Sequence, residues 1–302
     1  MSDSHDTSHI LQSLAVNVAI AAAKGVAAFF TGSGALLAET IHSSADCANQ
    51  LLLLLGLRRA GLPPDARHPL GYGRSLYFWS FIVALMLFTG GGVFSIYEGI
   101  HKLRHPEPVQ LVGVGLGILG FSLLLEGGAA LSNIRQLNRR RGAVPFFRYL
   151  QATKESDLIL VFGENAAASV GLVAAICALL LAWQTGDERW DAAGSIVIGL
   201  VLVSVAVFLA VEVKSLLVGE AAEPAVEQAA RAVAMDTEGI EEVLRVITVQ
   251  QGPCEVLVAM KVRVHDALDA TGVCQVINRF EVELRRRAPE VRWLFVEPDL
   301  AD

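Results

Sequence analysis

One apolar segment of the chain carries ionisable side chains at regular helical spacing. In ALLAETIHSSADCANQLLLLLG, Glu39, His42, Asp46 and Asn49 follow one another at intervals of three and four residues, so a helix would align them in one stripe. His42 and Asp46, at i and i+4, offer an imidazole nitrogen and a carboxylate to one point, which is half of a site for zinc or another borderline divalent ion. The alternative is an interhelical hydrogen-bond network that only holds a bundle together.

A second apolar segment supplies further donors. In LILVFGENAAASVGLVAAICALLL, Glu164 and Asn165 lie near the start, and Gly163, Ala167 and Gly171 repeat at four-residue spacing beside them. Small residues at this spacing let two helices approach closely, which a site bridging the two segments requires. The alternative for Glu164 is a carboxylate at the membrane surface. The predicted metal site consists of four side chains: His42, Asp46, Glu164 and Asn165.

Other polar residues in the apolar segments are expected to lie beside the ion or its pathway, because ionisable groups are costly at bilayer depth. Lys24 is expected either to neutralise a carboxylate when the site is empty or to extend to the membrane surface. Glu126 is a weaker candidate, and Ser33 is expected to meet water. The predicted pathway residues are Glu39, Asn49, Gln50, Lys24 and Asn17.

The composition is that of a membrane protein. Mean hydropathy is +0.50, and the first two thirds of the chain contain apolar runs long enough to cross a hydrocarbon core about 30 Å thick. Arginine and lysine gather in the loops after the second and fourth runs, so the positive-inside rule places these loops and both termini in the cytoplasm. The predicted spans are 11–31, 35–57, 76–100, 109–131, 158–183 and 192–213.

After residue 214 the sequence changes to mixed charge with alternating apolar positions, which indicates a separate domain. A helix is predicted over 223–237, strands over 243–251 and 254–264, a helix over 271–288 and a last strand over 291–298. This order predicts a two-layer, ferredoxin-like α+β domain that senses the ion or joins two chains. The predicted organisation is a cytoplasmic tail (1–10), an all-α six-helix transmembrane bundle (11–214) and a cytoplasmic α+β domain (215–302).

Several function classes are disfavoured. The net charge of −7 argues against a nucleic-acid partner, and the four cysteines lack the spacing of a disulfide framework or thiolate zinc site. The chain contains no nucleophile elbow, phosphate loop or HExxH motif, so it is not expected to be an enzyme. The start is polar and acidic rather than a cleavable signal, so we expect a retained first span. The Gly-, Leu- and Arg-rich composition without a targeting segment favours a bacterial plasma (inner) membrane over an organelle.

These features together resemble the cation diffusion facilitators, a family of metal ion/proton antiporters, and within it the zinc transporter 9-like branch. The matching stretches are GSGALLAETIHSSADCANQLLLLLGL followed by DARHPLGYGR, then DAAGSIVIGLVL, KSLLVGEAAE and the late FVEPD. The resemblance implies a homodimer without a permanently bound cofactor. It further implies that the protein exports Zn²⁺ or a similar divalent ion from the cytoplasm in exchange for protons, by alternating access at a midmembrane site between spans 2 and 5.

The span-5 ligands depart from the family pattern, although His42 and Asp46 match the span-2 pair. Many zinc-transporting members carry His-x-x-x-Asp where this chain has Val161 and Asn165; the similar branch often has Glu-Asp, so Glu164 is retained and Asn165 replaces a carboxylate. One imidazole, two carboxylates and one amide form a harder donor set, so Mn²⁺, Fe²⁺ and Co²⁺ become alternatives to Zn²⁺. A transport-impaired homologue that acts as metal sensor or assembly partner is the alternative function.

A loop site seen in some family members is also incomplete. Asp65 and His68 are present after span 2, but Tyr72 stands where a second histidine is expected. The resemblance therefore implies at most a weak loop site for metal.

Overall fold

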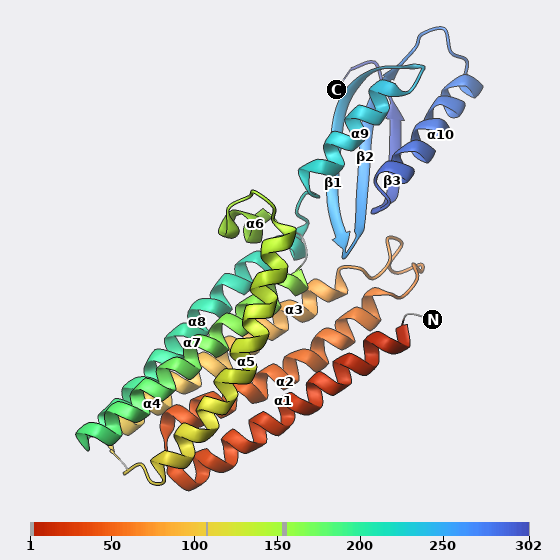
Figure 1. The fold of residues 1–302 in the computed structure, drawn as a ribbon. Helices are drawn as coiled ribbons and strands as arrows, with labels where there is room; N and C mark the ends of the chain where they lie inside the picture. The colour runs from red at the N-terminus through yellow and green to blue at the C-terminus, as the bar shows by residue number, and fades with distance from the viewer. Residues whose placement is uncertain (1–2, 107, 153–155, 302) are drawn as a thin grey trace. The chain divides into compact units, whose positions relative to one another are not determined.

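The computed structural model describes residues 3–106, 108–152 and 156–301 (Figure 1). The chain folds into two compact units. The first contains the described residues of 1–55, 79–149 and 156–212, and the second those of 56–78, 150–155 and 213–302. The predicted three-part division at residues 10 and 214 stays a prediction.

In the described residues, six long helical segments account for most of the chain before residue 219. They are α1 (Asp3–Thr31), α2 (Gly34–Ala60), the continuous run of α3 (Ser75–Met86), η1 (Leu87–Val93) and α4 (Phe94–Arg104), α5 (Val112–Arg140), α7 (Ser156–Thr185) and α8 (Arg189–Val218). The short α6 (Phe146–Ala152) lies between α5 and α7. Each predicted span overlaps one long segment, and α1 begins within the predicted tail.

Among the described residues, four segments are long and apolar enough to cross a membrane: Ser75–Arg104, Val112–Arg140, Phe162–Thr185 and Arg189–Val218. The apolar part of α1 is shorter, Asn17–Thr31, and α2 carries the polar stripe. Spanning by α1 and α2 therefore stays a prediction. Large apolar side chains face outward from the helices, with Phe29 84% and Leu124 77% exposed, as contact with lipid requires.

Glycines bring η1 and α4 close to the backbone of α8. A Cβ at Gly199 of α8 would lie 2.6 Å from Cγ1 of Ile96 and 2.8 Å from the carbonyl oxygen of Gly92. Helices in membranes approach this closely only where side chains are absent or small. The contact includes Gly92 of the π-helical η1, whose sequence LFTGGGV falls within the predicted span 76–100.

The described residues after 218 form the predicted α-β-β-α-β unit. Its elements are α9 (Pro224–Asp236), β1 (Ile240–Gly252), β2 (Glu255–Val264), α10 (Ala270–Arg287) and β3 (Val291–Pro298), each within three residues of its predicted bounds. β2 pairs antiparallel with β1 and parallel with β3. Alternate β2 residues such as Val258 and Met260 share a core with Val226 of α9 and Phe280 of α10, so both helices cover one face. The ferredoxin-like assignment stays a prediction.

The close approach of α4 and α8 predicts a specific sensitivity at Gly199. Gly199→Ala places a Cβ against backbone atoms of the facing helix, so we expect the free energy of unfolding to fall by about 1–3 kcal/mol. Gly90→Ala is the matched control, since its Cβ would meet nothing within 4 Å. Thermal unfolding in detergent measures both. An equal response of the two variants would contradict the packing described.

Candidate metal centre on α2

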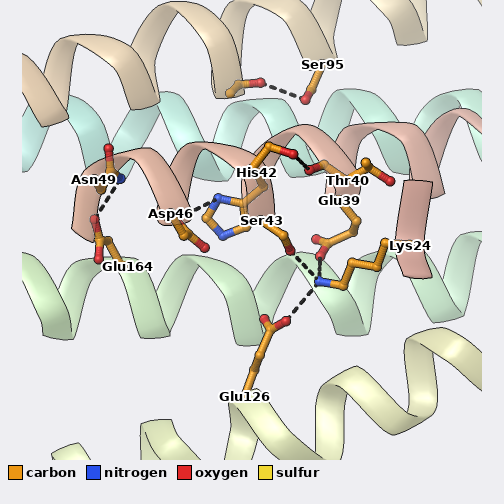
Figure 2. A network of polar contacts seen from close by, with 12 residues as sticks. Lys24, Glu39, Thr40, His42, Ser43, Asp46, Asn49, Ser95, Glu126 and Glu164 are labelled. Carbon is orange, nitrogen blue, oxygen red and sulfur yellow. Dashed lines mark hydrogen bonds and ion pairs between the residues drawn. The ribbon is translucent and has the colours of Figure 1, made fainter. Parts of the chain in front are cut away.

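α2 carries the predicted polar stripe into the interior of the bundle. The side chains of Glu39, His42 and Asn49 are fully buried, and that of Asp46 is 19% exposed. Figure 2 shows these groups following one another along α2, as their spacing predicts. The stripe faces other helices rather than lipid, so every polar atom on it depends on the bundle for a partner.

His42 and Asp46 are neighbouring side chains that could both bind a metal ion. Nδ1 of His42 lies 3.6 Å from Oδ1 of Asp46, which is beyond hydrogen-bond distance. Within the described residues, these two atoms and Nε2 of His42 lack a hydrogen-bond partner. A buried polar group without a partner costs about 1–3 kcal/mol. A divalent ion would satisfy both side chains, since zinc binds imidazole nitrogen and carboxylate oxygen at about 2.0–2.2 Å.

Glu164 joins α7 to the stripe. Its Oε1 accepts a hydrogen bond of 2.8 Å from Nδ2 of Asn49, and Figure 2 shows the two side chains pointing toward each other from α7 and α2. Asn165, next along α7, is half-buried. Gln50, beside Asn49, is also half-buried, and its Oε1 has no hydrogen-bond partner in the described part of the chain.

The donors on α2 and α7 form two halves that are not closed around one point. Among the residues whose side chains the structure describes, no group of three or more histidine, cysteine, aspartate and glutamate side chains is close enough to hold a metal ion. His42 and Asp46 form one half. Glu164, bonded to Asn49, forms the other.

The small residues of α7 contact two different helices. A Cβ at Gly163 would lie 3.2 Å from side-chain atoms of Val205 and Leu209 on α8, whereas a Cβ at Gly171 would overlap Oε1 of Glu39 on α2. The expected approach of α7 to α2 is therefore present at Gly171. At Gly163 the expectation is wrong, because that residue faces α8.

Lys24 of α1 lies at the centre of a buried charge network. Its ammonium donates hydrogen bonds to Oε2 of Glu39 (3.1 Å), Oγ of Ser43 (2.8 Å) and Oε1 of Glu126 on α5 (2.9 Å) (Figure 2). Lys24 and Glu39 are fully buried, and the side chain of Glu126 is 18% exposed. Lys24 thus neutralises carboxylates and does not extend to a membrane surface. Asn17, earlier on α1, is half-buried.

A buried carboxylate that the sequence analysis did not select holds the start of α2. Asp191 of α8 accepts hydrogen bonds from the hydroxyl of Ser33 (2.5 Å) and from the backbone N–H groups of Gly34 (2.6 Å) and Ala35 (3.3 Å). Nζ of Lys102 lies 3.9 Å from it. A carboxylate at a helix N-terminus satisfies free N–H groups and stabilises the helix dipole. Ser33 was expected to meet water; it is 1% exposed.

Asp65 organises the loop between α2 and α3. Its Oδ1 accepts hydrogen bonds from the backbone N–H groups of Arg67 (2.8 Å) and His68 (2.7 Å), and its Oδ2 accepts one of 2.7 Å from the Tyr72 hydroxyl. The hydrogen bond from Tyr72 is the largest cause that lowers the pKa of Asp65, and the two backbone hydrogen bonds lower it further. The hydrogen bond between Tyr72 and Asp65 also raises the pKa of Tyr72. Asp65 and His68 are about half exposed. A weak metal site at these two residues stays a prediction.

A family model for the cation efflux transmembrane domain matches residues 10–218, which include the whole α2 stripe and the Lys24 network. The chain belongs to the cation efflux family. With the four apolar helices, this membership identifies a multi-pass membrane protein. The predicted family resemblance is confirmed.

Several curated proteins are similar to the chain. Proton-coupled zinc antiporter SLC30A9, mitochondrial, of Xenopus laevis is 34% identical over 198 residues, which are 65% of this chain and 35% of the relative. Metal tolerance protein C4 of Arabidopsis thaliana is 30% identical over 223 residues (73% and 49%). Zinc transporter ZitB of Escherichia coli is 29% identical over 220 residues (67% and 62%). The matched region therefore spans about a third of the length of the first relative and about half of the second.

The buried hydrogen bonds of Asp191 predict that its removal lowers the free energy of unfolding. Asp191→Ala leaves several buried donors without an acceptor, so we expect the free energy of unfolding to fall by about 3 kcal/mol. Asp187→Ala removes an exposed carboxylate that accepts from the backbone N–H of Arg189 and should cost about 0.5–1 kcal/mol. Chemical unfolding in detergent micelles compares the two. Equal losses would show that Asp191 does not hold α2.

Proposed function

We propose that the chain exports a divalent metal cation from the cytoplasm in exchange for protons, with Zn²⁺ as the first candidate and Mn²⁺, Fe²⁺ and Co²⁺ as alternatives. The observation that carries this proposal is the buried pair of His42 and Asp46, whose open nitrogen and oxygen donors lie inside a cation efflux domain. Relatives described as a zinc antiporter and a zinc transporter support Zn²⁺ as the first candidate.

The proposed ion site comprises His42 and Asp46 of α2 with Glu164 and Asn165 of α7. To take part, the Glu164 carboxylate must exchange its hydrogen bond with Asn49 for the ion. That exchange would draw α7 against α2 at the level of Asp46 and close the two halves. Tetrahedral coordination by one imidazole and oxygen donors suits zinc, and the amide and carboxylates also suit harder ions.

Exchange with protons follows from competition for the same donors. A metal needs the neutral imidazole and the ionised carboxylate, so metal binding releases protons and proton binding expels the metal. A free imidazole has a pKa of about 6.5, which puts this competition in the physiological range. His42 and Asp46 are the residues proposed to carry it.

The wider assembly follows from the family resemblance and the charge pattern. We propose six spans with both termini in the cytoplasm, a homodimer joined through the α+β unit, and the plasma (inner) membrane as the location. The arginine-rich loops support the orientation. SLC30A9 is described as mitochondrial, so the membrane is a separate question for localisation.

Flux into proteoliposomes tests the transport proposal. With a proton gradient imposed and Zn²⁺, Mn²⁺, Fe²⁺ and Co²⁺ compared, we expect gradient-dependent uptake that His42→Ala or Asp46→Ala reduces to the level of empty vesicles. His101→Ala, an exposed histidine on α4, is the matched control and should retain flux. Undiminished uptake with unchanged pH dependence in His42→Ala would refute the proposed site.

A transport-impaired homologue is the second candidate function. Two observations favour it: Asn165 stands in place of a carboxylate, and the described donors do not close into a metal cage. Asn165→Asp separates the candidates. A working transporter should change its flux by less than about tenfold, or about 1.4 kcal/mol, whereas a degraded site should gain more than that. Absent flux in the folded wild-type chain would favour the metal sensor or assembly partner.

A further inference from the structure

The ammonium of Lys24 is held in the manner of a bound cation. It has three N–H donors, and three oxygens from two helices surround it: Glu39 and Ser43 on α2, and Glu126 on α5. The nitrogen-to-oxygen distances are 2.8 to 3.1 Å. Lys24 itself comes from a third helix, α1, so its ammonium joins that helix to oxygens on the other two (Figure 2).

The donor set around this ammonium is composed of oxygen alone. Two carboxylates and a hydroxyl are ligands of hard divalent cations such as Mg²⁺, Ca²⁺ and Mn²⁺, whereas the imidazole of the His42 site suits borderline ions. Hard cations bind oxygen at about 2.0–2.6 Å, so the carboxylate oxygens, at 2.9 and 3.1 Å from the ammonium, would need to close by about 0.3 to 1.1 Å around an ion that replaced it.

The carboxylates of Glu39 and Glu126 each have a second oxygen that does not contact Lys24. In the part of the chain that the structure describes, Oε1 of Glu39 and Oε2 of Glu126 are buried without a hydrogen-bond partner. Gly171 of α7 accommodates the free Glu39 oxygen, because any side chain there would overlap it. Each carboxylate thus has one oxygen that the ammonium does not use.

The charge balance depends on Lys24. The two ionised carboxylates carry two negative charges and the ammonium offsets one, which leaves the cluster at minus one. Without Lys24, the buried carboxylate of Glu39 and the largely buried one of Glu126 would remain uncompensated, and such charges are strongly unfavourable unless they are paired or bind a metal. A divalent cation would neutralise the pair.

We infer that Lys24 is a resident cation that occupies an oxygen-only site formed by Glu39, Ser43 and Glu126, and that it excludes a second divalent ion from the chain. The site lies along the same helix as His42, three residues away at Glu39 and one at Ser43. Two divalent ions at this spacing would repel each other in a medium of low dielectric constant. Lys24 therefore leaves the proposed site at His42 as the place for a divalent ion on this part of α2. The inference rests on the contacts of Lys24 and does not require that the chain transports metal.

The test counts bound Mn²⁺ in the purified full-length chain after chelation and re-equilibration with manganese chloride, by elemental analysis. All variants carry His42→Ala and Asp46→Asn, so failure of the proposed transport site cannot affect the count. Lys24→Met should bind about one additional Mn²⁺ per chain relative to this background. Lys24→Arg keeps the positive charge and should bind none in addition. Lys24→Met with Glu126→Gln should lose the added ion.

Folding of Lys24→Met is followed by thermal unfolding with and without Mn²⁺. A rise in its unfolding temperature with Mn²⁺, or restored folding on Mn²⁺ addition, supports the inference when the Glu126→Gln partner variant shows neither effect. A folded Lys24→Met chain without additional Mn²⁺ overturns it. Unfolding of Lys24→Met that Mn²⁺ does not reverse also overturns it, because a divalent cation then fails to replace the ammonium.

Discussion

A polar group inside a membrane bundle must find its partner on another helix, because hydrocarbon supplies none. α2 carries several such polar groups, and most of them have their hydrogen-bond or ion-pair partners on neighbouring helices. Three helices supply the matching charges: Lys24 on α1, Glu164 on α7 and Asp191 on α8. His42 differs from these groups, since both of its ring nitrogens and the facing Oδ1 of Asp46 have no partner among the described residues. A transported ion would supply the partner that His42 and Asp46 lack.

Two cation environments of different chemistry follow one another along α2. Around His42 the donors are nitrogen and oxygen and stand open, whereas around Lys24 they are oxygen alone and already hold an ammonium. In the proposed arrangement, the fixed charge of Lys24 beside the open His42 site would leave one place for a divalent ion rather than two. It also ties α1 and α5 to α2 through contacts that do not involve the proposed ligands.

Helical periodicity and the free-energy cost of polar groups in a membrane made part of the structure predictable from the sequence. Polar residues in an apolar run are conspicuous, so the α2 stripe and its internal order followed from spacing, and the αββαβ unit followed from alternation. The partners were harder to predict because they come from distant helices. Glu126 lies 102 residues from Lys24 and ranked as a weak candidate. Asp191 stands at the start of an apolar run, where a carboxylate usually meets water, and its burial depends on the turn at Ser33 folding against it. The π-helical η1 lies against α8 through Gly92, a contact between distant segments that local pattern does not show.

We propose that a divalent metal binds to His42 and to oxygen donors between α2 and α7. X-ray absorption spectroscopy of Zn²⁺ bound to the purified chain tests it most directly, because the technique counts imidazole, oxygen and sulfur neighbours of the metal. We predict a shell of nitrogen and oxygen at about 2.0–2.2 Å with a single imidazole, which His42→Ala removes. A sulfur neighbour at about 2.3 Å, as half-buried Cys47 beside Asp46 would give, or an imidazole signal that persists in His42→Ala, would contradict the account.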